Sequence, residues 1–202
     1  MAFGKALGVG KESDVYDALA PNEERVAIKF HRLGRTSFKK TKIKRDYTTE
    51  YNYTPNWHHR SRIAARREYM ALKRLYLNGV AVPKPIKQTR HVLAMSMIEG
   101  AELFRYHKLQ NPKIVLTEIL LNVRIAYQRV SMIHGDLSPF NIIIKPDEQI
   151  LIIDWPQYIS KNHPNAMEIL ERDVQNILSF FERKYKTDYY LEEILNYITK
   201  KT

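Results

Sequence analysis

The chain has 202 residues, no cysteine and a formal net charge of +11, with 33 Lys and Arg against 22 Asp and Glu. This length suits one large domain or two small lobes, and the lack of cysteine excludes disulfides and metal-thiolate sites. No apolar run is long enough to span a bilayer and the N-terminus does not read as a signal peptide, so we expect a soluble, cytoplasmic protein without a membrane partner. The basic excess favours a polyanionic partner such as RNA.

Residues 8–16, Gly-Val-Gly-Lys-Glu-Ser-Asp-Val-Tyr, predict a strand, a glycine turn and a returning strand. Gly8 and Gly10 let the backbone approach a phosphate closely, and successive N–H groups of such a turn can face an anion. A plain hairpin turn is the alternative interpretation. The turn is not a P-loop, because the glycines are too close together and Glu12 stands where Ser or Thr should be.

The next strand, Val26-Ala27-Ile28-Lys29-Phe30, alternates in character, so Lys29 is expected on the face opposite Val26, Ile28 and Phe30. In a kinase-like hairpin that face looks into the cleft, where a lysine can hold the α- and β-phosphates of ATP. An exposed lysine on a half-buried strand is the alternative.

Residues 34–56 have no persistent period and predict a long flexible loop, with a dense run of Lys and Arg from 35 to 45. Residues 60–77 then predict a basic helix. The stripe expected to be buried consists of Ala65, Tyr69, Leu72 and Tyr76. The basic residues between 35 and 67 are the expected contact for RNA.

Glu68 is the only acid in this helix and flanks the expected stripe. In a kinase-type helix C it would pair with Lys29 and orient the ammonium group for phosphate. A local ion pair with Arg or Lys on a neighbouring turn is the alternative.

Residues 92–98 predict an apolar strand. In a two-lobed kinase its end becomes the hinge that binds adenine. Ser96 and Ile98 would then supply a carbonyl and an N–H group, and Met95 would lie at the back of the pocket. An apolar strand with no binding role is the alternative.

A long helix is expected from Pro112 to Val130, and the loop that follows carries the chemistry. An apolar run delivers Asp136 into a loop, Asn141 follows five positions later, and a second apolar run ends at Asp154. Asp136 can hold or deprotonate a hydroxyl group, while the other two residues offer hard oxygen ligands to Mg²⁺. The alternative is a loop with ordinary turn-forming Asp and Asn. His134 we interpret as a packed scaffold residue rather than a base.

After Asp154, helices are expected from about His163 and from about Tyr190 to Lys200. The first of these should bury a stripe that consists of Ile169, Leu170, Val174, Ile177, Leu178 and Phe181. This short stretch has no room for the activation segment and peptide-binding helices of an ordinary protein kinase.

Together these motifs resemble the RIO family of atypical protein kinases, and its second subfamily in particular. The matching segments are 8–16, Val-Ala-Ile-Lys (26–29), His-Gly-Asp-Leu-Ser-Pro-Phe-Asn (134–141), Ile-Asp-Trp-Pro-Gln (153–157), His-Pro-Asn-Ala (163–166) and Glu-Arg-Asp-Val (171–174). The resemblance implies an α+β, two-lobed, protein-kinase-like fold of the trimmed RIO type, without activation segment or peptide-binding helices. The expected lobes are 1–98, with sheet, basic loop and helix C, and the mostly helical 99–202.

The resemblance also implies binding of ATP and Mg²⁺, with Mn²⁺ as an alternative metal, and serine/threonine kinase or ATPase activity in maturation of the small ribosomal subunit and its rRNA. By position, Lys29, Glu68 and Asp136 are catalytic, and Asn141 and Asp154 hold the metal. Asp154 is also implied as a transient acceptor of the γ-phosphoryl group. The nucleotide-binding set is Gly8, Val9, Gly10, Lys11, Ser13, Lys29, Met95, Ser96 and Ile98. Because the subfamily usually has a winged-helix domain before the glycine turn, the chain is expected to be a fragment or a shortened member.

Two other functions fit parts of this pattern. Aminoglycoside and choline kinases share a His-Gly-Asp loop, but the glycine turn and Asp-Trp-Pro-Gln weigh against a small-molecule phosphotransferase. A non-catalytic RNA-binding module with a kinase-like fold would not need the complete Lys, Glu, Asp, Asn and Asp set.

Overall fold

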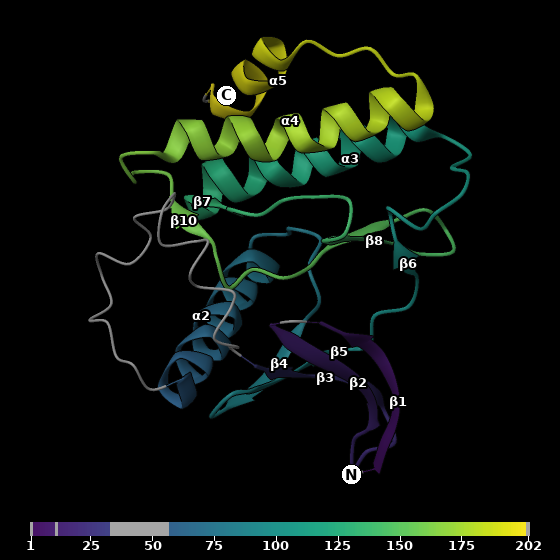
Figure 1. Cartoon of the computed structure of the whole chain (residues 1–202), viewed down its shortest axis with the longest axis vertical. Coiled ribbons are helices and arrows are strands. Elements are labelled where there is room, and N and C mark those ends of the chain that lie inside the picture. Colours follow the sequence, from purple (N-terminus) through teal and green to yellow (C-terminus); the bar gives the residue numbers. More distant parts are fainter. Residues whose placement is uncertain (1, 11, 33–56, 201–202) are drawn as a thin grey trace. The chain divides into compact units, whose positions relative to one another are not determined.

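The computed structural model describes residues 2–10, 12–32 and 57–200 (Figure 1). Two compact units form: Met1–Met70 with Lys84–Ile98, and Ala71–Pro83 with Glu99–Thr202. The sequence-based division placed residues 71–83 in the first lobe. They group with the second unit because Arg74 donates to the carbonyl of Val130 and the Ala81 N–H donates to Asn122 Oδ1.

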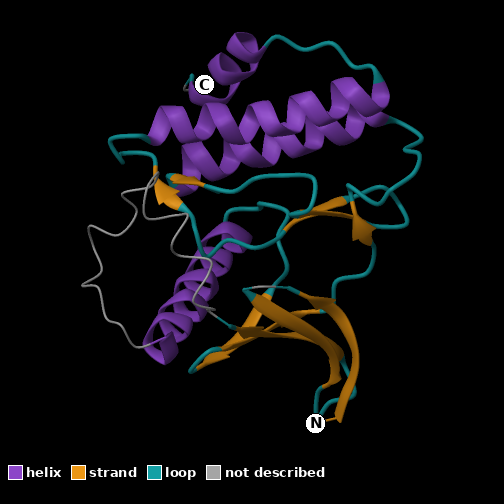
Figure 2. Cartoon of the chain, viewed as in Figure 1, coloured by secondary structure: helices purple, strands orange, loops and turns teal. Residues whose placement is uncertain are grey.

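The first unit contains a five-stranded antiparallel sheet (Figure 2) and the part of the long helix at residues 57–77 that precedes Ala71. Its strands are β1 (Ala2–Val9), β2 (Ser13–Leu19), β3 (Arg25–His31), β4 (Pro85–Thr89) and β5 (Val92–Ser96), in the order β1-β2-β3-β5-β4. The Gly10 N–H donates to the carbonyl of Ser13 at 2.9 Å and closes the turn between β1 and β2. The predicted strand, glycine turn and returning strand are therefore confirmed.

Strand β3 separates an apolar face from a charged one. Val26 and Ile28 are buried in a cluster with Ala18, and Phe30 packs against it. Lys29 and His31 contact helix α2 (Trp57–Leu77) on the opposite face. The predicted alternation along this strand is confirmed.

The buried stripe of α2 differs in part from the prediction. Its fully buried residues are Ser61, Ala65, Glu68, Ala71, Leu72 and Leu75, whereas Tyr76 is 44% exposed. The predicted stripe is confirmed at Ala65 and Leu72, is only half-buried at Tyr69 and was wrong at Tyr76, because the prediction did not expect a glutamate on the buried face. Glu68 does not flank the stripe; it is part of it, and its ion pairs explain why a carboxylate is tolerated there.

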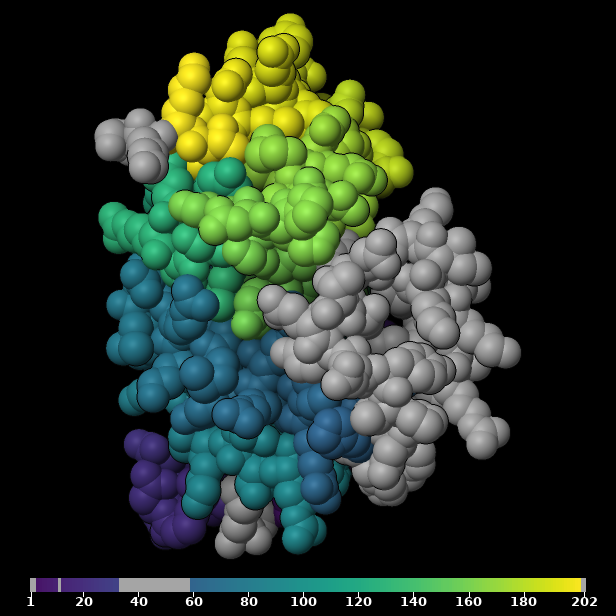
Figure 3. Space-filling model, turned by 90° about the vertical axis from the view of Figure 1, so that its left-hand side faces the viewer, coloured from purple at the N-terminus to yellow at the C-terminus, as the bar shows by residue number. Residues whose placement is uncertain are grey.

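Three α-helices and short strands form the second unit. The helices are α3 (Pro112–Ile125), continued by the π-helical turn η1 (Ala126–Val130), α4 (Ala166–Tyr185) and α5 (Leu191–Thr199). The strands are β6 (Ala101–Glu102), β7 (Met132–Ile133), β8 (Ile142–Ile144), β9 (Ile150–Ile152) and β10 (Ile159–Ser160). They form a β6-β8-β9 sheet and a β7–β10 pair. Helix α5 packs on α3 and α4, and its surface adjoins that of α4 (Figure 3).

The predicted helices of this unit are confirmed with small changes. Helix α3 begins at Pro112, but the Asn111 side chain makes no cap hydrogen bond; its carbonyl instead accepts from Ile114. The helix predicted to reach Val130 ends as a π-turn, which Ser131 closes in a left-handed conformation. The predicted inner stripe of α4 is buried throughout. In the described part of the chain, no helix is long and apolar enough to cross a bilayer.

Candidate active site

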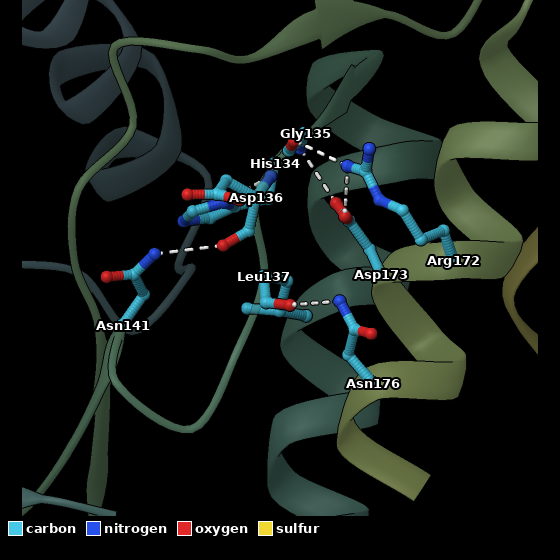
Figure 4. Close-up of polar contacts among 8 residues, drawn as sticks. All are labelled: His134, Gly135, Asp136, Leu137, Asn141, Arg172, Asp173 and Asn176. Atoms are coloured by element: carbon cyan, nitrogen blue, oxygen red, sulfur yellow. Dashed lines mark hydrogen bonds and ion pairs between the residues drawn. The ribbon is translucent and has the colours of Figure 1, made fainter. Parts of the chain in front are cut away.

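The loop after β7 is built around a glycine that no other residue can replace without strain. Gly135 has φ +83°, and an added Cβ would lie 2.5 Å from the carbonyl oxygen of Gln157. Its N–H donates to Asp173 Oδ2 at 2.7 Å, and its carbonyl accepts from Arg172 at 2.6 Å (Figure 4). Helix α4 therefore holds the residue that precedes Asp136 at both of its backbone polar groups.

Sequence reasoning did not assign a role to Arg172 or Asp173. Asp173 is 1% exposed and also accepts from Arg172 at 2.8 Å through Oδ1. The available signal was its place on the inner stripe of α4, at helical spacing from Leu170 and Ile177. An acid on a buried stripe needs partners, and here they are the Gly135 N–H of the loop before Asp136 and the neighbouring Arg172 of α4.

His134 joins the two segments that carry the candidate carboxylates. The Asp136 N–H donates to His134 Nδ1 at 3.2 Å, so that nitrogen is an acceptor and the proton is assigned to Nε2. His134 Nε2 then donates to the carbonyl of Ile153 at 2.9 Å. The ring is buried beside Trp155, with 4.6 Å between ring centroids. The interpretation of His134 as a scaffold residue is confirmed.

Asn141 is hydrogen-bonded to both of the segments that carry the candidate carboxylates Asp136 and Asp154. Its Nδ2 donates to the carbonyl of Asp136 at 2.9 Å, and its own carbonyl accepts from the Ile153 N–H at 2.9 Å. The side-chain oxygen of Asn141 points away from the Asp136 carbonyl (Figure 4). Asp154, next along the chain, has φ +67°, in the left-handed region that Asp and Asn adopt more readily than most residues. One side-chain and one backbone hydrogen bond of Asn141 therefore link the segment of Asp136 to the residue that precedes Asp154.

This donor set fits Mg²⁺. A carboxylate and an amide oxygen are hard ligands, and the amide orientation leaves Asn141 Oδ1 as the atom that can face a cation. Among the described residues no group of three or more His, Cys, Asp or Glu side chains forms a metal cage. Mg²⁺ bound to nucleotide does not need one, because phosphate oxygens and waters complete its shell.

In the first unit, Lys29 and Glu68 form a buried ion pair. Lys29 Nζ lies 2.8 Å from Glu68 Oε1, and their side chains are 6% and 2% exposed. Burial by itself raises the pKa of Glu68, but the Lys29 ammonium and the His31 ring outweigh it and lower that pKa from 4.5 to about 2. Glu68 is therefore ionised at neutral pH. The predicted partner of Glu68 is Lys29, as the contact shows, and not a residue on a neighbouring helical turn.

Several of the other predicted nucleotide contacts lie on the same sheet as Lys29. Met95 is buried and pairs in register with Ala27, while the Ser96 N–H donates to the carbonyl of Lys84. Ser13 pairs in register with His31. Gly8 and Val9 end β1, Gly10 lies in the turn that follows, and Ile98 lies just beyond the end of β5. Lys11 and residues 33–56 of the basic loop lie outside the described residues. That these groups share one nucleotide with Asp136 and Asp154 of the second unit stays a prediction.

Comparison with known proteins places this geometry in a family. Residues 14–194 match the RIO domain. The chain is 40% identical over 182 residues to the serine/threonine-protein kinase rio2 of Dictyostelium discoideum, and 39% identical over 185 residues to that of Schizosaccharomyces pombe. It is 38% identical over 209 residues to the RIO-type serine/threonine-protein kinase Rio2 of Methanocaldococcus jannaschii. These alignments cover 90%, 92% and 98% of this chain.

The solved structures agree. A crystal structure of the Rio2 kinase–ADP/Mg²⁺–phosphoaspartate complex from Chaetomium thermophilum matches with a TM-score of 0.78 and 30% identity, covering 100% of this chain and 62% of that one. The fold is thus the α+β fold of the protein-kinase-like proteins, in its trimmed form. The chain belongs to the RIO family and, within it, to the Rio2 subfamily. It spans 34%, 53% and 76% of the Dictyostelium, Schizosaccharomyces and Methanocaldococcus relatives.

Proposed function

We propose that this chain is an ATP- and Mg²⁺-dependent phosphotransferase of the Rio2 type, working as a serine/threonine kinase or as an ATPase. The observation that carries the proposal is the buried ion pair of Lys29 and Glu68. A buried ion pair is a poor way to stabilise a fold, since apolar residues of similar volume serve as well or better. Its presence on the strand and helix where kinases orient the phosphate-binding lysine supports a role in nucleotide binding.

The catalytic loop would supply the remaining parts. Asp136 would orient and deprotonate the attacking hydroxyl group, and Asn141 with Asp154 would hold the metal. Mg²⁺, when bound, would neutralise charge on the β- and γ-phosphates. The bonds from α4 to Gly135 and from His134 to the segment before Asp154 support this proposal, because they fix the two carboxylate-bearing segments before substrate arrives.

Adenine would lie against the Met95–Ile98 segment, and the turn at residues 8–13 would cover the phosphates. Among these contacts, Met95 is supported by its position on the same face of the sheet as Lys29, as the register of β3 and β5 implies.

For the location of the protein in the cell we propose the cytoplasm, whose reducing conditions suit a chain without cysteine.

We also propose Asp154 as a phosphoryl acceptor. The solved Rio2 kinase of Chaetomium thermophilum contains ADP, Mg²⁺ and a phosphoaspartate. In this chain an oxygen of Asp154 would attack the γ-phosphorus, the bond from that phosphorus to the β-phosphate oxygen would break, and ADP would leave. Water would then release inorganic phosphate and restore the carboxylate.

The activity is tested by ATP turnover in the wild type, Lys29→Met and Asp136→Asn. Both variants should lose at least about 100-fold in kcat/KM, since they remove phosphate binding and the catalytic base. Lys87→Met is the matched control, because Lys87 is exposed on β4. Wild-type protein without ATP turnover, or variants as active as the control, would refute the proposal.

The acceptor is tested by trapping label from γ-³²P-ATP. An acyl phosphate on Asp154 is released by hydroxylamine, whereas phosphoserine is not. We expect hydroxylamine-labile label in the wild type and none in Asp154→Asn. Label that resists hydroxylamine and is also present in Asp154→Asn identifies a hydroxyl acceptor and removes Asp154 from this role.

For a partner we propose RNA of the small-ribosomal-subunit precursor. The net charge of +11 and the exposed Arg62 and Arg66, one turn apart on α2, support a polyanion contact. Affinity for rRNA should fall steeply with salt, and Arg62→Ala with Arg66→Ala should lower the slope of log K against log salt by about 1 to 2. A slope that the double variant leaves unchanged would exclude this face of α2.

A further inference from the structure

Glu68 has two basic partners, one on each carboxylate oxygen. Lys29 Nζ lies 2.8 Å from Oε1, and His31 Nε2 lies 2.8 Å from Oε2. The His31 side chain is 3% exposed. The His31 contact lies within ion-pair distance but does not have the geometry of a hydrogen bond. It is an ion pair when the imidazole is protonated, and a contact from a neutral N–H when the proton lies on Nε2.

The strand geometry makes this arrangement a fixed one. Residues two apart on a strand share a face, so Lys29 and His31 both point toward α2. The backbone N–H of His31 donates to the carbonyl of His91 at 2.9 Å, and His31 pairs in register with Ser13 of β2. The His31 backbone is therefore held on both sides of the strand, and this fixes the point from which its imidazole reaches Glu68.

The second partner changes what Glu68 can do. A carboxylate bound through one oxygen can turn about its last side-chain bond, and its other oxygen would be buried without a partner. With a partner on each oxygen, the plane of the carboxylate is defined. Oε1 is then kept toward Lys29, the group that the proposed function places on the phosphates.

We propose that His31 is a positioning residue for phosphoryl transfer: it holds the second oxygen of Glu68 so that the first oxygen orients Lys29. The inference rests on the proposed kinase or ATPase function. His31 would act through Glu68 and not on the nucleotide itself.

Three variants separate positioning from packing. His31→Leu keeps similar volume but removes both nitrogens, and His31→Gln places an amide N–H₂ near the position of Nε2. His91→Leu is the matched control, because His91 packs beside Phe30 with 6.4 Å between ring centroids and is not a partner of Glu68. Thermal unfolding of each variant shows whether it is folded.

In ATP turnover we expect His31→Leu to lower kcat by about tenfold and to raise the KM for ATP, since the lysine loses its orientation in both ground and transition states. His31→Gln should recover at least half of the loss on a logarithmic scale, and His91→Leu should stay within about twofold of wild type. Equal turnover in His31→Leu and wild type, or no recovery in His31→Gln, would overturn the inference.

A second readout does not depend on activity. Carbon-13 NMR of the Glu68 carboxyl group gives its titration midpoint, which should rise in His31→Leu and return toward wild type in His31→Gln. An unchanged midpoint in His31→Leu would overturn the inference even if ATP turnover is absent, so the two proposals fail separately. If His31→Leu does not fold, His31→Asn replaces it, because the shorter amide of asparagine cannot reach Oε2. Equal titration midpoints of Glu68 and equal ATP turnover in His31→Asn and His31→Gln would then overturn the inference.

Discussion

Removing the Asp173 carboxylate should loosen the catalytic loop without removing any residue that touches substrate. Its side chain is 2% exposed and accepts from the Gly135 N–H and from Arg172. A hydrogen bond to a buried charged group contributes about 1.5–3 kcal/mol, and leaving the donor unpaired costs a similar amount. The Arg172 contact adds less than about 1 kcal/mol, because its guanidinium is 35% exposed and screened by water. Asp173→Ala should therefore destabilise the loop by roughly 2–4 kcal/mol.

Hydrogen exchange at the Gly135 amide measures this directly. A loss of roughly 2–4 kcal/mol lowers its protection factor by about 30-fold to 1,000-fold if exchange occurs through local opening. Asp173→Asn keeps the size and one acceptor but loses the charge, so its effect should be intermediate. Glu171→Ala changes an exposed acid on the same helix and is the matched control.

Turnover should follow the order of protection, with wild type and Glu171→Ala highest and Asp173→Ala lowest. If the Gly135 amide stays protected in Asp173→Ala while helix α4 keeps its own protection, the bond from Asp173 does not hold the loop. The reasoning that links α4 to the catalytic loop would then be wrong.

Three further results are expected. The pKa of Glu68 is lowered from 4.5 to about 2, so its charge stabilises the folded protein by roughly 3 kcal/mol above pH 4.5, and this stabilisation is lost as the pH falls from 4.5 toward 2. In acid unfolding, the free energy of unfolding of Glu68→Gln should therefore change less with pH over that range than that of the wild type. Parallel curves for the two proteins would contradict the assignment. Gly135→Ala should destabilise more than Gly79→Ala in thermal unfolding, because both glycines have positive φ but the added Cβ clashes at residue 135 and meets nothing within 4 Å at residue 79; equal losses would show that the loop adjusts. Asn141→Ala should raise the Mg²⁺ concentration for half-maximal ATP turnover by about tenfold or more, and an unchanged Mg²⁺ requirement would exclude Asn141 as a ligand.

Most of the fold was predictable from local patterns in the sequence. The alternation along β3, the proline at the start of α3 and the helical spacing along α4 each depend on neighbours a few residues apart, and each was predictable. Which residues of α2 are buried was not fully predictable, because the burial of Glu68 depends on its two partners Lys29 and His31, which precede it by 39 and 37 residues in the chain. A charge on a buried face is visible in a sequence only if its partners are known.

In the candidate site, too, the features that depend on local sequence were predictable and those that depend on distant contacts were not. Asp136, Asn141 and Asp154 follow from residue type and spacing, because the chemistry of a metal and phosphate site restricts both. The contribution of Asp173 depends on how α4 packs against the catalytic loop, and spacing does not encode that contact. The predicted strand ended at Phe30 and His31 was given no role, because nothing in the local sequence distinguishes it from an ordinary residue at the end of a strand.

Because the backbone at Asp154 is left-handed, mutagenesis at this position can separate the loss of charge from a change in the main chain. Asparagine adopts that conformation about as readily as aspartate, whereas a β-branched side chain does not. An amide at this position should therefore leave the main chain where it is and remove only the negative charge. Inactivity of that one variant would report on chemistry, while inactivity of a valine variant would mix lost chemistry with a rebuilt turn.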